Sequence, residues 1–155
     1  MTGFTGVIFR RNSMYSIGVD IGGSKIAAGI VGEEYKLISK KSLPFPHTGN
    51  PMDSITTIQT LISGLIAENN LKTEQIDAIG LAVPGSIDYD RGVVIDAHNL
   101  DYHDFPLCKL VEEWFPGVTV YVENDANAAA LAEYYGGAFR GCSSGLLITI
   151  GTRIR

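Results

Sequence analysis

Five residues near the start of the chain could hold phosphates and a metal ion: Asp20, Gly22, Gly23, Ser24 and Lys25. The carboxylate of Asp20 can hold Mg²⁺ through water, because Mg²⁺ takes one or two carboxylates and keeps waters and phosphates as its other ligands. Gly22 and Gly23 let backbone N–H groups approach phosphate oxygens, and Ser24 and Lys25 add side-chain donors. Short glycine motifs often match by chance, so an ordinary hairpin beside an acidic residue is the alternative.

A second segment, residues 122–130, places a carboxylate where a predicted strand gives way to a predicted helix. Asn124 and Asp125 stand there ahead of an alanine-rich run. Asp125 is our candidate catalytic base, which would take the proton of a hydroxyl as that oxygen attacks a phosphate. A helix N-terminus stabilises the anion and so makes it a weaker base, but a loose phosphoryl-transfer transition state asks little of the base. The alternative is that Asp125 simply caps the helix.

The hydrophobic pattern predicts the elements that position the first segment. Strands are predicted at 15–21, 25–31 and 35–43, and their short links indicate an antiparallel meander. Gly22 and Gly23 are expected to make the first turn, because glycine accepts positive φ at little cost. A helix is then predicted from Asn50, a good N-cap residue, with apolar side chains recurring at helical spacing as far as Ile66.

The rest of the chain alternates strands with helices. We expect a buried strand at 76–83, a long polar loop at 85–105, a short helix at 106–115, a strand at 118–122, a helix at 125–135 and a last strand at 146–150. A loop as long as 85–105 inside a compact domain is usually functional. The element order predicts an α/β fold whose mixed sheet has the meander on one side and parallel crossovers on the other, flanked by helices.

Composition narrows the function classes. The chain has 155 residues, a hydrophobic fraction of 45%, a charged fraction of 19% and a net charge of −5. This balance is typical of a globular cytoplasmic enzyme and argues against a nucleic-acid partner, which would call for a basic surface. No apolar run is long enough for a membrane span. The two cysteines do not form a disulfide framework, and His98 and His103 are weak evidence for a metal site.

Five segments in order resemble the ROK family (repressors, open reading frames, kinases), which includes bacterial glucokinases. They are Asp20 to Lys25, Ala82 to Asp88, Ala97 to Leu100, Glu123 to Ala130 and Leu147 to Thr152. Any one of these matches is weak alone, whereas five in the same order are a specific signal. The resemblance implies the actin-like ATPase (ribonuclease H-like) fold.

The resemblance also implies a reaction and its participants. The expected activity is ATP-dependent phosphorylation of a glucose-like hexose at its 6-hydroxyl, with ATP and Mg²⁺ as cofactors and a small sugar as substrate. Asp125 would be the base, and Asn124 would hydrogen-bond sugar hydroxyls. The alternative for Asn124 is that it caps the helix entry. The other sugar-side candidates are Gly85, Ser86, Asn99 and Leu100, and a second phosphate turn would begin with Thr149, Gly151 and Thr152.

The domain organisation follows from where the matched segments lie. We expect residues 1–14 to be an appended or disordered leader. Residues 15–155 would form the N-terminal domain of a sugar kinase, truncated before its second domain, so that the isolated chain would be inactive. A homodimer of the full-length protein is left open. Two alternatives are a sugar-responsive ROK repressor that lacks its DNA-binding region, and a non-catalytic sugar-binding fragment.

Overall fold

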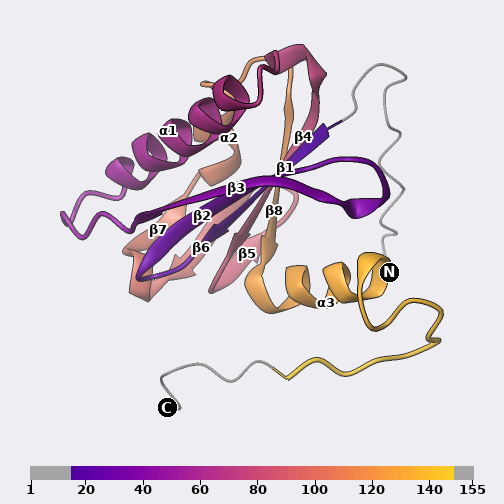
Figure 1. Ribbon diagram of the computed structural model, residues 1–155. Coiled ribbons are helices and arrows are strands. Elements are labelled where there is room, and N and C mark those ends of the chain that lie inside the picture. Colours follow the sequence, from indigo (N-terminus) through magenta and orange to yellow (C-terminus); the bar gives the residue numbers. More distant parts are fainter. Residues whose placement is uncertain (1–14, 149–155) are drawn as a thin grey trace.

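The computed structural model describes residues 15–148, and these form a twisted five-stranded sheet with helices around it (Figure 1). The strand order is β3-β2-β1-β4-β8. Strands β1 (Tyr15–Ile21), β2 (Lys25–Val31) and β3 (Leu37–Pro44) are antiparallel neighbours. Strands β4 (Ile76–Val83) and β8 (Thr119–Asn124) run parallel to β1. The predicted mixed sheet, with a meander on one side and parallel crossovers on the other, is therefore confirmed.

Two helices cover one face of this sheet, and the core lies beneath them. Helix α1 (Met52–Glu68) packs on β2 and β3, and α2 (Leu107–Glu112) packs on β8. The strands send alternate side chains toward the helices, as the period of two requires. In β1, for example, Ile17, Val19 and Ile21 are buried, while Gly18 and Asp20 face the other way. None of the helices within residues 15–148 is both long and apolar enough to cross a membrane.

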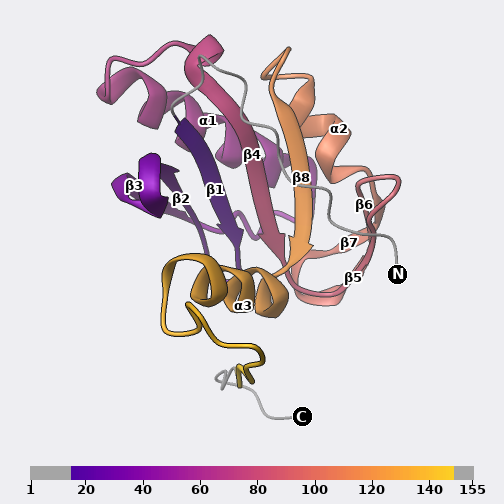
Figure 2. The ribbon, with the colours of Figure 1, turned by 90° about the vertical axis from the view of Figure 1, so that its right-hand side faces the viewer.

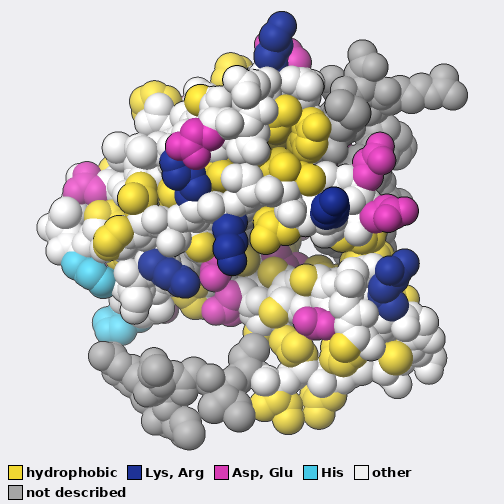
Figure 3. All heavy atoms as spheres, in the orientation of Figure 1, with side chains coloured by type: hydrophobic (Ala, Val, Ile, Leu, Met, Phe, Trp, Pro, Cys, Tyr) yellow, Lys and Arg dark blue, Asp and Glu magenta, His cyan; other side chains and the backbone are white. Residues whose placement is uncertain are grey.

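Helix α3 (Asp125–Gly136) lies apart from the other two. It crosses the end of the sheet toward which the arrowheads of β1, β4 and β8 point (Figure 2). None of its residues is buried. Its far end reaches the short 3₁₀ turn η1 (Glu33–Tyr35), where the rings of Tyr35 and Tyr135 lie 6.0 Å apart. Hydrophobic side chains gather over α3 at the lower right of Figure 3, and Leu131 and Tyr134 are among its exposed residues.

The segment predicted as a loop at 85–105 is instead a second sheet. Strands β5 (Ser86–Asp88), β6 (Val93–Ala97) and β7 (Tyr102–Phe105) pair antiparallel in the order β5-β6-β7. The 3₁₀ turn η3 (His98–Leu100) joins the last two strands. The loop prediction was wrong because these strands bury only part of their side chains and expose many acidic ones.

Tyr102 anchors the small sheet to α1. Its hydroxyl and the Ser54 hydroxyl lie 2.6 Å apart, and both residues are fully buried. The ring also stacks on Phe105, with centroids 4.4 Å apart. Burial raises the pKa of the Tyr102 phenol to about 12. Because the small sheet shares the main core, its loops have fixed positions beside the end of the large sheet.

Several boundaries differ from those predicted. Tyr35 belongs to η1 rather than to β3, and a 3₁₀ turn η2 (Thr73–Gln75) precedes β4. Gly22 and Gly23 make the first turn without positive φ, so the reason given for glycine there was wrong. In the last predicted strand, residues 146–148 have no regular structure, and Leu146 and Ile148 are largely exposed. Residues 149–150 of that strand and the predicted leader at 1–14 lie outside the described residues.

Candidate active site

Two carboxylates from distant parts of the chain line one cavity. Asp20 lies at the end of β1 and Asp125 at the start of α3, and both line a cavity of about 380 Å³. The carboxyl ends of parallel strands meet at one edge of a sheet, which is where α/β folds bind ligands. The other lining residues are Ala82, Ala126, Ala128 and Ala129, whose small side chains leave the space between the carboxylates open.

The charges of Asp125 and Lys25 act on the Asp20 carboxyl. Partial burial is the main cause that raises the pKa of the Asp20 carboxyl above its usual value, and the negative charge of Asp125 raises it further. The ammonium group of Lys25 acts in the opposite direction. Two carboxylates that repel each other across a cavity favour a cation between them. The site can therefore attract a metal ion or another positive group.

Asn124, rather than Asp125, caps the helix. The Asn124 Oδ1 accepts hydrogen bonds from the backbone N–H groups of Ala126 (3.1 Å) and Asn127 (3.4 Å). Asp125 is the first helical residue, and its Oδ1 accepts the N–H of Ala126 at 2.8 Å. Its carboxylate also lines the cavity. Capping is therefore performed by the neighbouring residue, which weakens the alternative that Asp125 is only a helix cap.

The glycine turn, residues 22–24, approaches the same edge of the sheet. The Gly22 N–H is used to close the hairpin, since it donates to the Lys25 carbonyl at 3.0 Å. The amides of Gly23 and Ser24 have no hydrogen-bond partner within residues 15–148. A Cβ atom at Gly23 would lie 3.3 Å from Asn99 Nδ2, so glycine lets the turn sit directly against η3. The turn thus offers two free donors close to Asn99.

The four sugar-side candidates also lie around this edge. Gly85 ends the turn after β4, and its carbonyl accepts a hydrogen bond from Asn124 Nδ2 at 3.3 Å. Ser86 is exposed at the start of β5, and Asn99 contacts the glycine turn. The Leu100 side chain is buried in the core, so only its backbone could meet a ligand. The predicted residues therefore come together, apart from Thr149, Gly151 and Thr152, which lie outside the described residues.

The donor set fits the expected Mg²⁺ ion. No group of three or more His, Cys, Asp or Glu side chains that could hold a metal occurs among residues 15–148. Mg²⁺ does not need one, because it binds through one or two carboxylates together with waters and substrate phosphates. Asp20 and Asp125 supply two carboxylates facing one cavity, and the free amides of the glycine turn suit phosphate oxygens.

Two residues at the site were not singled out by the sequence. The Glu123 carboxylate accepts hydrogen bonds from the Asn124 N–H and from the hydroxyl of Tyr89. Glu123 belongs to the same matched segment as Asp125 and could have been found there. Tyr89 carried no signal, because it lies in a stretch predicted as loop and meets Glu123 only through the tertiary fold.

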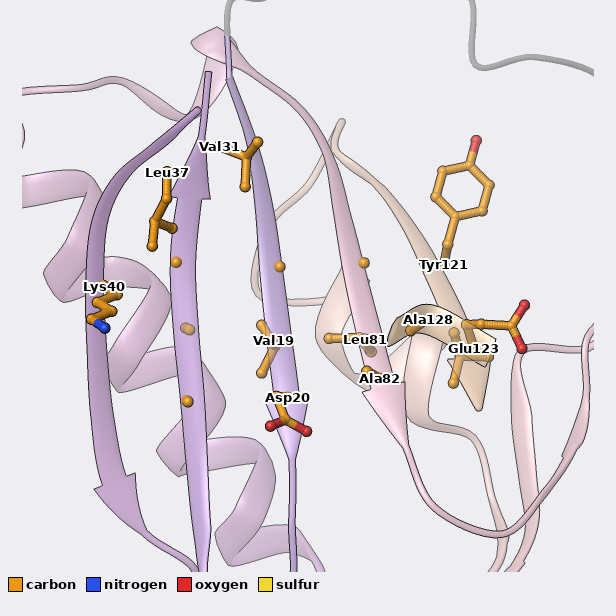
Figure 4. A pocket seen from close by; sticks show the side chains of 16 residues that line it. Val19, Asp20, Val31, Leu37, Lys40, Leu81, Ala82, Tyr121, Glu123 and Ala128 are labelled. Carbon is orange, nitrogen blue, oxygen red and sulfur yellow. The ribbon is translucent and has the colours of Figure 1, made fainter. Parts of the chain in front are cut away.

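A larger apolar groove lies beside the carboxylate cavity. It has a volume of about 540 Å³ and runs along the sheet face that α1 and α2 leave open. Gly18, Gly29 and Gly80 stand in register across three strands and form part of its floor. Figure 4 shows Asp20 at one end of β1 and Glu123 on β8. Asp20 is thus placed between the groove and the carboxylate cavity, both of which it lines.

Comparison with known proteins identifies the class. The model of the ROK family matches residues 16–154, which is most of the chain. The chain belongs to the ROK family, and its structure has the actin-like ATPase fold of the ROK sugar kinases.

Three relatives show how similar the chain is to known proteins in sequence and in structure. The chain is 39% identical over 137 residues to the glucokinase of Streptomyces coelicolor, covering 88% of this chain and 41% of that protein. The crystal structure of a ROK glucokinase from Streptomyces griseus in complex with glucose and AMPPNP superposes with a TM-score of 0.72 at 38% identity, covering 82% of this chain and 38% of that one. A ROK transcriptional regulator, a homologue of an Escherichia coli protein, has a TM-score of 0.67 at 17% identity and shares the fold alone. The chain therefore spans about two fifths of the glucokinases that it matches.

Proposed function

We propose that this chain is the N-terminal, sugar-binding part of a ROK hexose kinase that transfers the γ-phosphate of ATP to the 6-hydroxyl of a glucose-like sugar. The cavity shared by Asp20 and Asp125 is the observation that carries the proposal. The glucose and AMPPNP bound by the Streptomyces griseus relative support the choice of substrate and of ATP. The proposal includes a second domain beyond residue 155, a cytoplasmic location and Mg²⁺ as the metal.

In this mechanism each residue has a separate task. Asp125 orients the sugar hydroxyl and accepts its proton as the oxygen attacks phosphorus. Asn124 and Ser86 hydrogen-bond other hydroxyls, and the free amides of the glycine turn bind phosphate oxygens. Asp20 would hold Mg²⁺ through water, and the metal would neutralise the charge that develops on the phosphoryl group. Phosphoryl transfer depends mostly on such positioning and charge neutralisation.

The test is the turnover of two proteins. One is the 155-residue chain, which we expect to form no ADP in response to sugar. The other joins this chain to the part of the Streptomyces coelicolor glucokinase that follows the matched region. With a panel of hexoses, the fusion is expected to form ADP and a sugar 6-phosphate. An Asp125→Asn variant of the fusion should lose about 10²- to 10⁴-fold in kcat, the usual contribution of a general base, while its sugar affinity changes little.

The matched control is Asp53→Asn. Asp53 is also an acidic residue in the first turn of a helix, α1, but it does not line the carboxylate cavity. Near-normal turnover of the Asp125→Asn fusion, or an equal loss in the Asp53→Asn fusion, would remove Asp125 from the role of base. Sugar binding by the fusion without formation of ADP or a sugar phosphate would favour the repressor alternative, whose fold is the same.

A further inference from the structure

One carboxylate oxygen of Glu123, close to the proposed base Asp125, accepts three hydrogen bonds. Glu123 Oε1 accepts the Tyr89 hydroxyl at 2.8 Å, the Asn124 backbone N–H at 2.7 Å and Asn127 Nδ2 at 3.1 Å. The three donors come from the turn after β5, from the strand–helix junction and from the first turn of α3. Glu123 thus joins three segments at the point where β8 becomes α3.

The bonds to Glu123 fix the junction that carries Asp125. Asn124 has extended backbone and is the N-cap, and Asp125 is the next residue. Hydrogen bonds to an ionised carboxylate are shorter and roughly twice as strong as those between neutral groups. The bond from the Asn124 N–H therefore restrains the backbone rotation that aims Asp125. The bond from Asn127 restrains the same turn from the helix side.

Tyr89 ties this junction to the second sheet. It follows β5, in a turn where Asp88 Oδ1 accepts the Arg91 N–H at 3.1 Å. A second tie lies nearby, because Asn124 Nδ2 donates to the Gly85 carbonyl. The hydrogen bond to Glu123 is the main cause that raises the pKa of the Tyr89 phenol above its usual value.

We propose that Tyr89 is a positioning residue: through Glu123 it holds the Asn124–Asp125 junction in the orientation that phosphoryl transfer requires. The proposal rests on the proposed function of Asp125. Tyr89 does not line the carboxylate cavity, and its hydroxyl is connected to the site through Glu123. Loss of its hydroxyl should reduce kcat by a larger factor than it raises the sugar KM.

The test compares Tyr89→Phe with Tyr121→Phe. Tyr121 lies on the same strand and the same face as Glu123, is exposed to a similar extent (47% against 55% for Tyr89), and has no hydrogen bond from its hydroxyl within residues 15–148. In ¹⁵N-labelled 155-residue chain, Tyr89→Phe is expected to shift the amide resonances of Asn124 and Asp125 and the side-chain amide of Asn127. Tyr121→Phe should leave all three in place.

Kinetics of the fusion protein complete the test. Tyr89→Phe should lower kcat about tenfold, which corresponds to a small misalignment of the base, with the sugar KM within about twofold of the parent. Glu123→Gln is a second variant that keeps the shape but removes the charge, and it should lower kcat at least as much. Tyr121→Phe should turn over like the parent.

The outcomes separate the two proposals. If Asp125→Asn keeps its turnover, the proposed function fails. If Asp125→Asn is inactive while Tyr89→Phe matches Tyr121→Phe in kcat and in the Asn124 amide resonance, the kinase proposal stands and the role of Tyr89 is wrong. A Tyr89→Phe variant that raises KM without lowering kcat would also overturn that role, because it would mean direct contact with the sugar.

Discussion

Replacing Gly85 with alanine should damage both the fold and the site. Gly85 has a φ of +100°, a conformation that side-chain-bearing residues rarely adopt. An added Cβ would lie 2.0 Å from the carbonyl oxygen of Asp96. This oxygen is a backbone atom of strand β6, so it cannot rotate away as a side chain could. One of the two backbone segments must therefore move.

The cost has two parts. Holding alanine at this φ costs about 1–3 kcal/mol. Relieving the overlap resembles overpacking of a core, which costs about 1–3 kcal/mol more. The sum, about 2–6 kcal/mol, is a large share of the 5–15 kcal/mol or so by which domains are stable. The same movement would pull the Gly85 carbonyl from Asn124, whose side chain caps α3.

Gly117→Ala separates the conformational cost from the cost of the steric overlap. Gly117 has a similar φ of +87°, but a Cβ there would meet nothing within 4 Å. It should therefore cost only the conformational part, and Gly85→Ala should exceed it by about 1–3 kcal/mol. Urea unfolding of the 155-residue chain, followed by far-ultraviolet circular dichroism, measures both free energies of unfolding. Equal losses for the two variants would refute the argument that the β4–β5 turn is packed against β6.

Two further predictions concern buried and charged groups. Ser54 donates its one hydroxyl hydrogen to the Pro51 carbonyl, so Tyr102 must donate to Ser54. Ser54→Ala leaves the buried phenol unpaired and should lower the free energy of unfolding by about 1–3 kcal/mol, whereas Tyr102→Phe should lower it by only about 0.5–1.5 kcal/mol. Urea unfolding that shows Tyr102→Phe to be the worse variant would contradict this assignment. Because the pKa of Asp20 is raised in the folded chain, its carboxyl favours folding in acid and loses that contribution as the pH rises through the raised pKa. Asp20→Asn should therefore have the same free energy of unfolding as the parent in acid and a higher one near neutral pH. A lower free energy of unfolding for the variant at neutral pH would contradict this reasoning.

The elements of the large sheet were predictable because their signals are local. Strands β1, β2 and β4 have the predicted bounds, since each is a run of apolar residues closed by glycine, proline or polar residues. The second sheet was not predictable in this way. Its strands have three, five and four residues, too few for a period of two to stand out from the surrounding acidic residues. Tyr102 becomes interpretable as an anchor only once the fold brings its hydroxyl to Ser54 of α1.

Asn124 shows why the residues of a site can be predicted when their division of tasks cannot. The sequence left it open whether Asn124 caps the helix or binds sugar. Its Oδ1 accepts two backbone N–H groups, so both lone pairs are used. Its Nδ2 gives one hydrogen to the Gly85 carbonyl and keeps the other. The capping role and the sugar role are therefore compatible: Asn124 can still donate one hydrogen bond to a hydroxyl, but it cannot also accept one without giving up the helix cap.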